Sequence, residues 1–236
     1  MHLSYFIARR YLFAKKSHNV INIISLISAI GIAVGSCALI IVLSIYNGFE
    51  EVVRSMYDRA MPDIAVTSAS SKYFRTDTPA FDAVRSMPSV ALYSESIEET
   101  VFLTYDREEG TAVLKGVEQA YTEDPELQSC IVDGEFSLMH GEVAQAVTGR
   151  GLAVEMGIRP RFLDPIEVYF PARDREISLV NPAASLNKET FYPIGMVFSG
   201  GESYANTLFV PIERARRLVG VPDNEAGVVE LRLVPG

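Results

Sequence analysis

The side chains most often used for catalysis and metal binding are few and widely spaced in this sequence. Its three histidines are His2, His18 and His140, and its two cysteines are Cys37 and Cys130. None of the histidines has a second histidine or a cysteine at the spacing of a metal-ligand pair. We therefore expect no metal site.

Carboxylates form two adjacent pairs, Glu98-Glu99 and Glu108-Glu109. Neighbouring side chains on a strand or turn point apart, so neither pair can place two carboxylates on one substrate. We expect both pairs to be solvated. The sequence also lacks GxxxxGK[ST] and GxSxG, the patterns of Walker nucleotide sites and of hydrolase nucleophiles. These observations predict a protein that is not an enzyme and binds no cofactor.

An uncharged apolar run of 23 residues, 23–45, organises the chain. As a helix it measures about 34 Å, enough to cross a bilayer core that is roughly 30 Å thick. The helix of a soluble core seldom stays apolar on all sides for so long. We therefore predict a transmembrane helix over residues 21–46. Val34-Gly35-Ser36-Cys37 resembles a lipoprotein cleavage box, but the apolar run continues past it, which favours an uncleaved signal-anchor.

One face of this helix carries the small residues Ser28, Gly31, Gly35 and Ala38. Steps of 3, 4 and 3 residues place them within about 80° of one another around a helix. Gly31 and Gly35 form a small-xxx-small pair, which lets the backbone of another membrane helix approach closely. We predict a packing seam of a helix bundle on this face. The alternative is that glycine is simply frequent in membrane helices.

Charge is distributed unevenly about the span. Four basic and no acidic residues precede it, whereas 30 acidic and 17 basic residues follow it. The positive-inside rule therefore predicts that residues 1–20 are cytoplasmic and that the main domain is extracytoplasmic. Apolar residues at helical spacing within residues 3–14 predict a short interfacial helix on the cytoplasmic leaflet. The acidic balance argues against nucleic acid as a partner.

The chain beyond the span mixes strand and helix patterns. Residues 47–61 keep helical spacing until Met61-Pro62 ends it, and predict a stalk helix. Strands are expected over residues 63–67, 90–93, 100–105, 111–117, 143–148, 166–170, 190–197, 207–210 and 228–233, and helices over residues 80–86, 152–156 and 212–219. Residues 121–137 are acidic and irregular. We predict an extracytoplasmic α+β domain over residues 62–236, large enough for two subdomains and without a disulfide.

A 19-residue segment, residues 171–189, separates two of these strands. Connections of this length are usually functional or disordered. Its candidate binding residues are Pro171, Arg173, Asp174, Arg175, Ile177 and Leu179. We predict a projecting hairpin that binds a partner.

Segments spread over nearly the whole chain share a family pattern. They are FIARRYL at residues 6–12, SLISAIGIAVG at 25–35, VLSIYNGFE at 42–50, LKGV at 114–117, GRGLAVEMG at 149–157, IEVYFP at 166–171 and NTLFVP at 206–211. Together they resemble the start of lipoprotein-releasing ABC transporter permeases of the LolC/LolE type, in the MacB/FtsX-like permease superfamily. The resemblance implies a MacB-like periplasmic core domain on a bacterial inner-membrane protein.

The resemblance also implies partners. In that family a cytoplasmic ABC ATPase drives two permease subunits, a homo- or heterodimer, which extract lipoproteins from membrane lipid and pass them to a periplasmic carrier. A projecting periplasmic hairpin captures the carrier in one type of family permease, and residues 171–187 hold the corresponding position. Arg173 and Arg175 suit an acidic partner surface. Leu163-Asp164-Pro165 stands where the family usually has Gly-Asp before the strand.

Family permeases carry three further transmembrane helices after this domain, so we expect this chain to be a fragment of a longer permease. Efflux permeases of the MacB type and cell-division permeases of the FtsX type share the architecture and are alternatives. A single-pass envelope scaffold or sensor is an alternative from another class.

Overall fold

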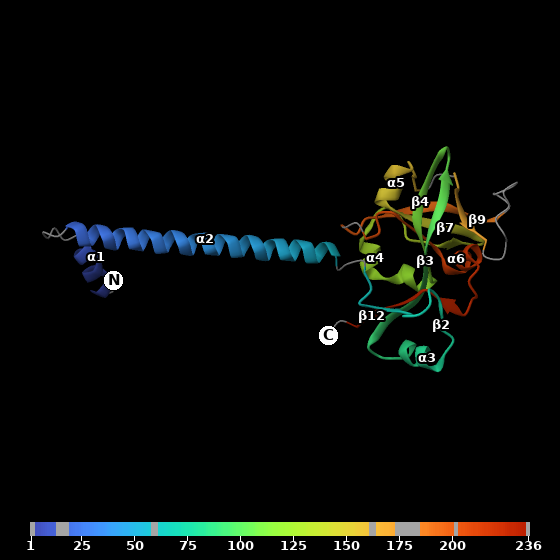
Figure 1. Cartoon of the computed structure of the whole chain (residues 1–236), viewed down its shortest axis with the longest axis horizontal. Coiled ribbons are helices and arrows are strands. Elements are labelled where there is room, and N and C mark those ends of the chain that lie inside the picture. The colour runs from blue at the N-terminus through green and yellow to red at the C-terminus, as the bar shows by residue number, and fades with distance from the viewer. Residues whose placement is uncertain are drawn as a thin grey trace. The chain divides into compact units, whose positions relative to one another are not determined.

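The computed structural model describes residues 3–12, 19–57, 61–160, 164–172, 185–200 and 203–234. It divides the chain into two compact units, Met1–Arg54 and Ser55–Gly236. Figure 1 shows the elements of both units. The helices are α1 (Leu3–Leu12), α2 (Asn19–Tyr57), α3 (Pro79–Arg85), η1 (Gln119–Glu123, 3₁₀), α4 (Pro125–Ser129), α5 (Arg150–Glu155) and α6 (Ile212–Val219). The strands are β1 (Ile64–Thr67), β2 (Phe74–Arg75), β3 (Val90–Tyr105), β4 (Glu108–Val117), β5 (Ile131–Gly134), β6 (Met139–His140), β7 (Val143–Gly149), β8 (Ile166–Pro171), β9 (Leu186–Val197), β10 (Thr207–Pro211), β11 (Glu225–Ala226) and β12 (Val228–Leu233).

Helix α2 is continuous over 39 residues. It contains one stretch, Ile23–Glu50, that is long and apolar enough to cross a membrane, and the side chains of its most apolar window are all exposed. The predicted span and the predicted stalk belong to one continuous helix, because α2 runs through Asn47 and Gly48. A single glycine costs a helix only about 1 kcal/mol, and the residues after Gly48 keep the helical spacing.

Six strands of the second unit close into a barrel. β3, β4, β10, β7, β9 and β8 pair in that order, and β8 pairs again with β3. A closed barrel leaves no free edge among its members. Its interior is filled by apolar side chains, among them Phe191, which is fully buried.

Two helices cover the ends of the barrel. α5 follows β7, and its residues Leu152, Ala153 and Met156 join the interior cluster. α6 follows β10 at the other end, where Ala215 and Leu218 join the same cluster. α6 therefore lies at the end where β4 and β10 finish, because these two strands are parallel.

A smaller group of elements extends the sheet beyond the barrel; we call β1, β2, α3, the first half of β3, β11 and β12 the small lobe. β12 pairs with β3, and β1 pairs with β12 as the outermost strand. The backbone N–H of Asp63 donates to the carbonyl of Leu231, and its carboxylate accepts from the N–H of Leu233, at 3.0 and 2.8 Å. The lobe has its own apolar cluster around Val229. The predicted division into two subdomains stays a prediction, since one sheet passes through both parts.

Most of the expected strands and helices are present, and α6 has the predicted bounds. Residues 90–93 and 100–105, predicted as separate strands, belong to the single sixteen-residue strand β3. Its polar middle stays extended because β12 and β4 pair with it on its two sides. Residues 121–137, predicted as irregular, contain the end of η1, α4 and β5. Cys37 is exposed and Cys130 buried, and both are free thiols.

Candidate functional site

β8 and β9 form a hairpin in the barrel wall, joined through residues 173–184. Their pairing ends with Pro171 opposite Leu186. Just beyond, the N–H of Ala172 donates to the carbonyl of Ser185 at 2.9 Å. The connecting segment therefore leaves and re-enters the barrel at one closed backbone pair. We call residues 169–172 and 185–189 the hairpin foot. Of the predicted binding residues, Pro171 is the last of β8, whereas Arg173, Asp174, Arg175, Ile177 and Leu179 lie outside the described residues.

Helix α6 is bonded to this foot. The side-chain amide of Asn187 donates to the carbonyl of Leu218 at 2.9 Å. The carboxylate of Glu189, whose side chain is 11% exposed, faces Arg214 at 3.3 Å and Arg217 at 3.6 Å. β9 is thus held to α6 by polar contacts as well as by apolar packing in the barrel interior.

The outer face of the foot carries an aromatic pair beside an ion pair. The rings of Phe102 and Tyr169 are 6.2 Å apart, and the ammonium of Lys188 lies 5.5 Å from the Tyr169 ring. Lys188 also pairs with Glu167 at 2.8 Å. The hydrogen bond from Lys188 lowers the pKa of Glu167, and the same bond raises the pKa of Lys188. Both charges therefore persist at neutral pH on a partly exposed apolar surface, which is typical of contact surfaces for proteins.

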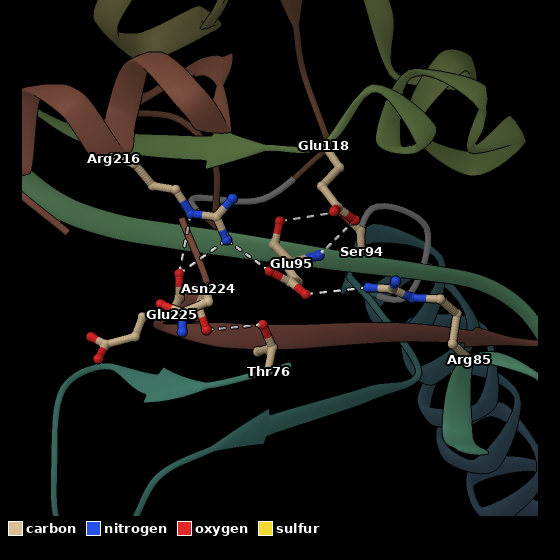
Figure 2. Close-up of polar contacts among 8 residues, drawn as sticks. All are labelled: Thr76, Arg85, Ser94, Glu95, Glu118, Arg216, Asn224 and Glu225. Atoms are coloured by element: carbon tan, nitrogen blue, oxygen red, sulfur yellow. Dashed lines mark hydrogen bonds and ion pairs between the residues drawn. The ribbon is translucent and has the colours of Figure 1, made fainter. Parts of the chain in front are cut away.

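Figure 2 shows a buried charge cluster centred on Glu95 of β3. Its carboxylate accepts hydrogen bonds from Nη2 of Arg216 in α6 at 2.7 Å and from Nη2 of Arg85 in α3 at 3.3 Å. The side chains of Glu95 and Arg216 are each 8% exposed. Arg216 also donates to the carbonyl of Glu225 through Nε and Nη2, at 3.2 and 3.0 Å. The guanidinium is therefore bonded on two sides, as a buried arginine requires.

A second carboxylate joins the cluster. Glu118 accepts the backbone N–H of Glu95 at 3.1 Å (Figure 2). Burial raises the pKa of Glu118, and the charge of Glu95 raises it further, against the lowering effect of that hydrogen bond and of Arg85 and Arg216. The cluster thus holds two carboxylates between two guanidiniums.

Lys115 of β4 is the centre of another buried cluster. Its ammonium lies 2.6 Å from Glu230 of β12 and 2.8 Å from Glu98 of β3. It also lies 5.2 Å from the Tyr204 ring and 5.7 Å from the Tyr121 ring. Burial alone would lower the pKa of Lys115, but the interactions with Glu230, Tyr204 and Glu98 together outweigh burial and raise it. Lys115 is therefore charged in the folded protein at all physiological pH values.

A groove of about 630 Å³ runs along α6, at the end of the barrel where β4 and β10 finish. Apolar side chains such as Leu138 line it, and so do two glutamates and the arginines Arg214 and Arg217. The size is typical of a ligand site. The opposite charges balance, so the lining favours neither anions nor cations.

The predicted packing seam lies on α2. Ser28, Gly31, Gly35 and Ala38 are all exposed. A Cβ on Gly31 or Gly35 would have no described atom within 4 Å. The seam is therefore open to a partner helix, and its use stays a prediction. Among the described residues there is no group of three or more His, Cys, Asp or Glu side chains that could hold a metal ion.

One expectation about the carboxylates is wrong. Glu99 is 8% exposed, bonded to Lys72 at 2.7 Å and to the hydroxyl of Tyr73, and is not solvated. Its neighbour Glu98 points to the other face and pairs with Lys115, as alternation along a strand requires. Glu108 and Glu109 are exposed, as predicted.

The buried clusters were not found from the sequence. Lys115 and Glu230 each interrupt an otherwise apolar strand pattern, VLKGV and VVEL. A charged residue in such a run signals a buried partner, but the partner's position depends on which strands pair.

Comparison with known proteins identifies the family. The family model described as "MacB-like periplasmic core domain" matches residues 25–232. The chain belongs to this family. It is thus a MacB-like permease-family protein, with an apolar N-terminal helix and an α+β domain of the periplasmic type, as the sequence predicted. Family membership and the apolar helix indicate a membrane-anchored protein with an extracytoplasmic domain.

Among curated proteins, "Lipoprotein-releasing system transmembrane protein LolC" of Neisseria meningitidis serogroup B (strain ATCC BAA-335 / MC58) is 42% identical over 60 residues. The match covers 25% of this chain and 14% of that relative. Among solved structures, the extracellular domain of the noncanonic ABC-type transporter YknZ from Gram-positive bacteria aligns at 13% identity and a TM-score of 0.48, over 71% of this chain and 77% of that one. The periplasmic region of MacB from Actinobacillus actinomycetemcomitans aligns at 11% identity and 0.46, over 75% and 79%.

Proposed function

We propose that this MacB-like protein is a permease subunit of an ABC transporter that releases lipoproteins from the inner membrane to a periplasmic carrier. The observation that carries the proposal is the 42% identity with a lipoprotein-releasing LolC protein over 60 residues. The hairpin in the barrel wall supports it, because residues 173–184 connect two strands whose ends are closed by a backbone pair at Ala172 and Ser185.

In this proposal the hairpin captures the carrier. Arg173 and Arg175 supply charge for an acidic carrier surface, and the aromatic and ion-paired outer face of the foot adjoins them in sequence. The remaining partners are a cytoplasmic ABC ATPase, a second permease subunit that packs on the Gly31 and Gly35 face, the lipoprotein substrate and membrane lipid. The basic N-terminus lies in the cytoplasm and the barrel in the periplasm. ATP hydrolysis belongs to the ATPase subunit.

The test is recovery of partners from native membranes. The tagged protein is purified from detergent extracts and its partners are identified by mass spectrometry. An ABC ATPase together with a lipoprotein carrier supports the proposal, and an ATPase with neither a carrier nor a lipoprotein contradicts it. In a parallel sample Arg173→Glu with Arg175→Glu removes the carrier but leaves the ATPase. Arg107→Glu, an exposed arginine in the β3–β4 turn, is the matched control and retains both.

A second function within the same family is efflux, and the family model itself carries the MacB name. Recovery of an ATPase with an outer-membrane channel would favour efflux. Recovery of an ATPase with a peptidoglycan hydrolase would favour a cell-division role of the FtsX type. A protein that brings down no ATPase is a single-pass scaffold or sensor.

A further inference from the structure

Helix α6 makes polar contacts with two parts of the second unit that do not pair with each other. On one side it binds the hairpin foot, through Asn187 and Glu189 of β9. On the other side Arg216 binds Glu95, which pairs with Val229 of β12 in the small lobe. Along the sheet, β9 is connected to β12 through β8 and β3 in one direction, and through β7, β10, β4 and β3 in the other. The helix is thus a direct polar link between the foot and the lobe.

The geometry leaves α6 little freedom to move alone. A Cβ on Gly116 of β4 would lie 2.3 Å from the Cβ of Ala215, so the helix rests directly on the strand backbone. The helix ends at Gly220, whose left-handed conformation lets its N–H bond the carbonyl of Arg216 at 2.8 Å. Figure 2 shows the Arg216 side chain leaving α6 toward Glu95 and the carbonyl of Glu225. A displacement of α6 at Glu95 therefore also displaces its contacts with the hairpin foot.

We infer that the Glu95–Arg216 pair positions the hairpin foot, by fixing α6 to the small lobe. Both side chains are buried and act through α6, so they are positioning residues. When the pair is broken, α6 loses its bond to β3, and Asn187 and Glu189 lose a fixed support. The backbone pairs of the foot then open more often, although their own hydrogen bonds are unchanged.

The test is amide hydrogen exchange, read by mass spectrometry on the full chain in detergent. Glu95→Gln keeps the side-chain volume and removes the charge. We expect exchange at Ala172 and at residues 186–190 to become faster by about tenfold or more. The control is Val229→Ala, which weakens the same strand pair by removing buried apolar atoms without touching α6. It leaves the foot amides within about twofold of the wild type. Equal acceleration in the two variants, or none in Glu95→Gln, overturns the inference.

A double variant separates positioning from stability. Glu95→Gln with Arg216→Met leaves no unpaired buried charge, so the thermal midpoint returns toward that of the wild type. The polar contact between α6 and β3 is still absent, so we expect the foot amides to keep exchanging fast. If their protection returns together with the midpoint, the pair serves stability alone and the inference fails. The measurement involves no partner protein, so its outcome is independent of the proposed transport function.

Discussion

Replacement of Lys115 by methionine tests the buried charge cluster between β4 and β12. The Lys115 side chain is 3% exposed and that of Glu230 is 6% exposed, whereas that of Glu98 is 44% exposed. Methionine keeps most of the volume and removes the ammonium. Glu98 can turn into water, but Glu230 remains buried, and its Oε2 has no hydrogen-bond partner among the described residues even with the lysine present.

The expected loss of stability follows from the burial of Glu230, which cannot turn into water as Glu98 can. Removing one partner of a buried ion pair costs about 3–5 kcal/mol, because the other charge stays desolvated. For a domain of 150–250 residues each kcal/mol shifts the thermal midpoint by about 2–4 °C. We therefore expect Lys115→Met to lower the midpoint by about 6–20 °C. Adding Glu230→Gln removes the unpaired buried charge and recovers most of the lost stability.

The assay is thermal and denaturant unfolding of the full chain in detergent, followed by near-UV circular dichroism of the second unit's tyrosines. The control is Lys188→Met, whose partner Glu167 is 35% exposed and whose own side chain is 45% exposed. An exposed pair of this kind contributes about 1 kcal/mol or less. The reasoning is refuted if Lys115→Met costs no more than Lys188→Met, or if the double variant is no more stable than Lys115→Met.

Three other perturbations have definite expected results. Glu118→Gln removes a carboxylate whose pKa is raised by folding, and the stability of the wild type therefore falls as the pH rises through that pKa. Relative to the wild type, the variant should be more stable near pH 7 and no more stable in acid. Denaturant unfolding at a series of pH values measures this difference. Gly116→Ala drives a methyl into Ala215 and should cost about 1–3 kcal/mol in denaturant unfolding, and an unchanged midpoint would contradict the contact. Gly35→Leu should reduce co-purification of the second permease subunit from native membranes, whereas Ala33→Leu on the opposite helix face should not; equal loss in both would argue against a seam.

Local signals in the sequence predicted the elements that depend on neighbouring residues. α6 begins after Pro211 and ends before Gly220, and its apolar positions recur at helical spacing, so its bounds were correct. β3 was split in two because its middle, Ser94 to Glu99, is too polar for a strand that is judged alone. Pairing with β12 and β4 supplies the hydrogen bonds that keep this part extended, and those strands are distant in the sequence.

The clusters could not be predicted for the same reason. Glu99 looked solvated beside Glu98, but its partner Lys72 lies 27 residues away and reaches it only through the fold. Closure of the barrel by β8 against β3 likewise joins residues that no local pattern connects. The hairpin became a candidate because a 19-residue connection is unusual between paired strands and because it holds the position of the family's projecting hairpin.

The pairing of β1 with β12 makes the first and last strands of the second unit direct neighbours, joined at Asp63 by bonds to Leu231 and Leu233. A domain whose first and last strands are neighbours is suited to insertion into another protein. It can be placed in a surface loop of a different host protein without stretching either chain, because the gap to bridge is the spacing of two adjacent strands, about 5 Å. The same geometry offers a route to circular permutants, in which a short linker joins the two strands and new termini are opened at the β3–β4 turn.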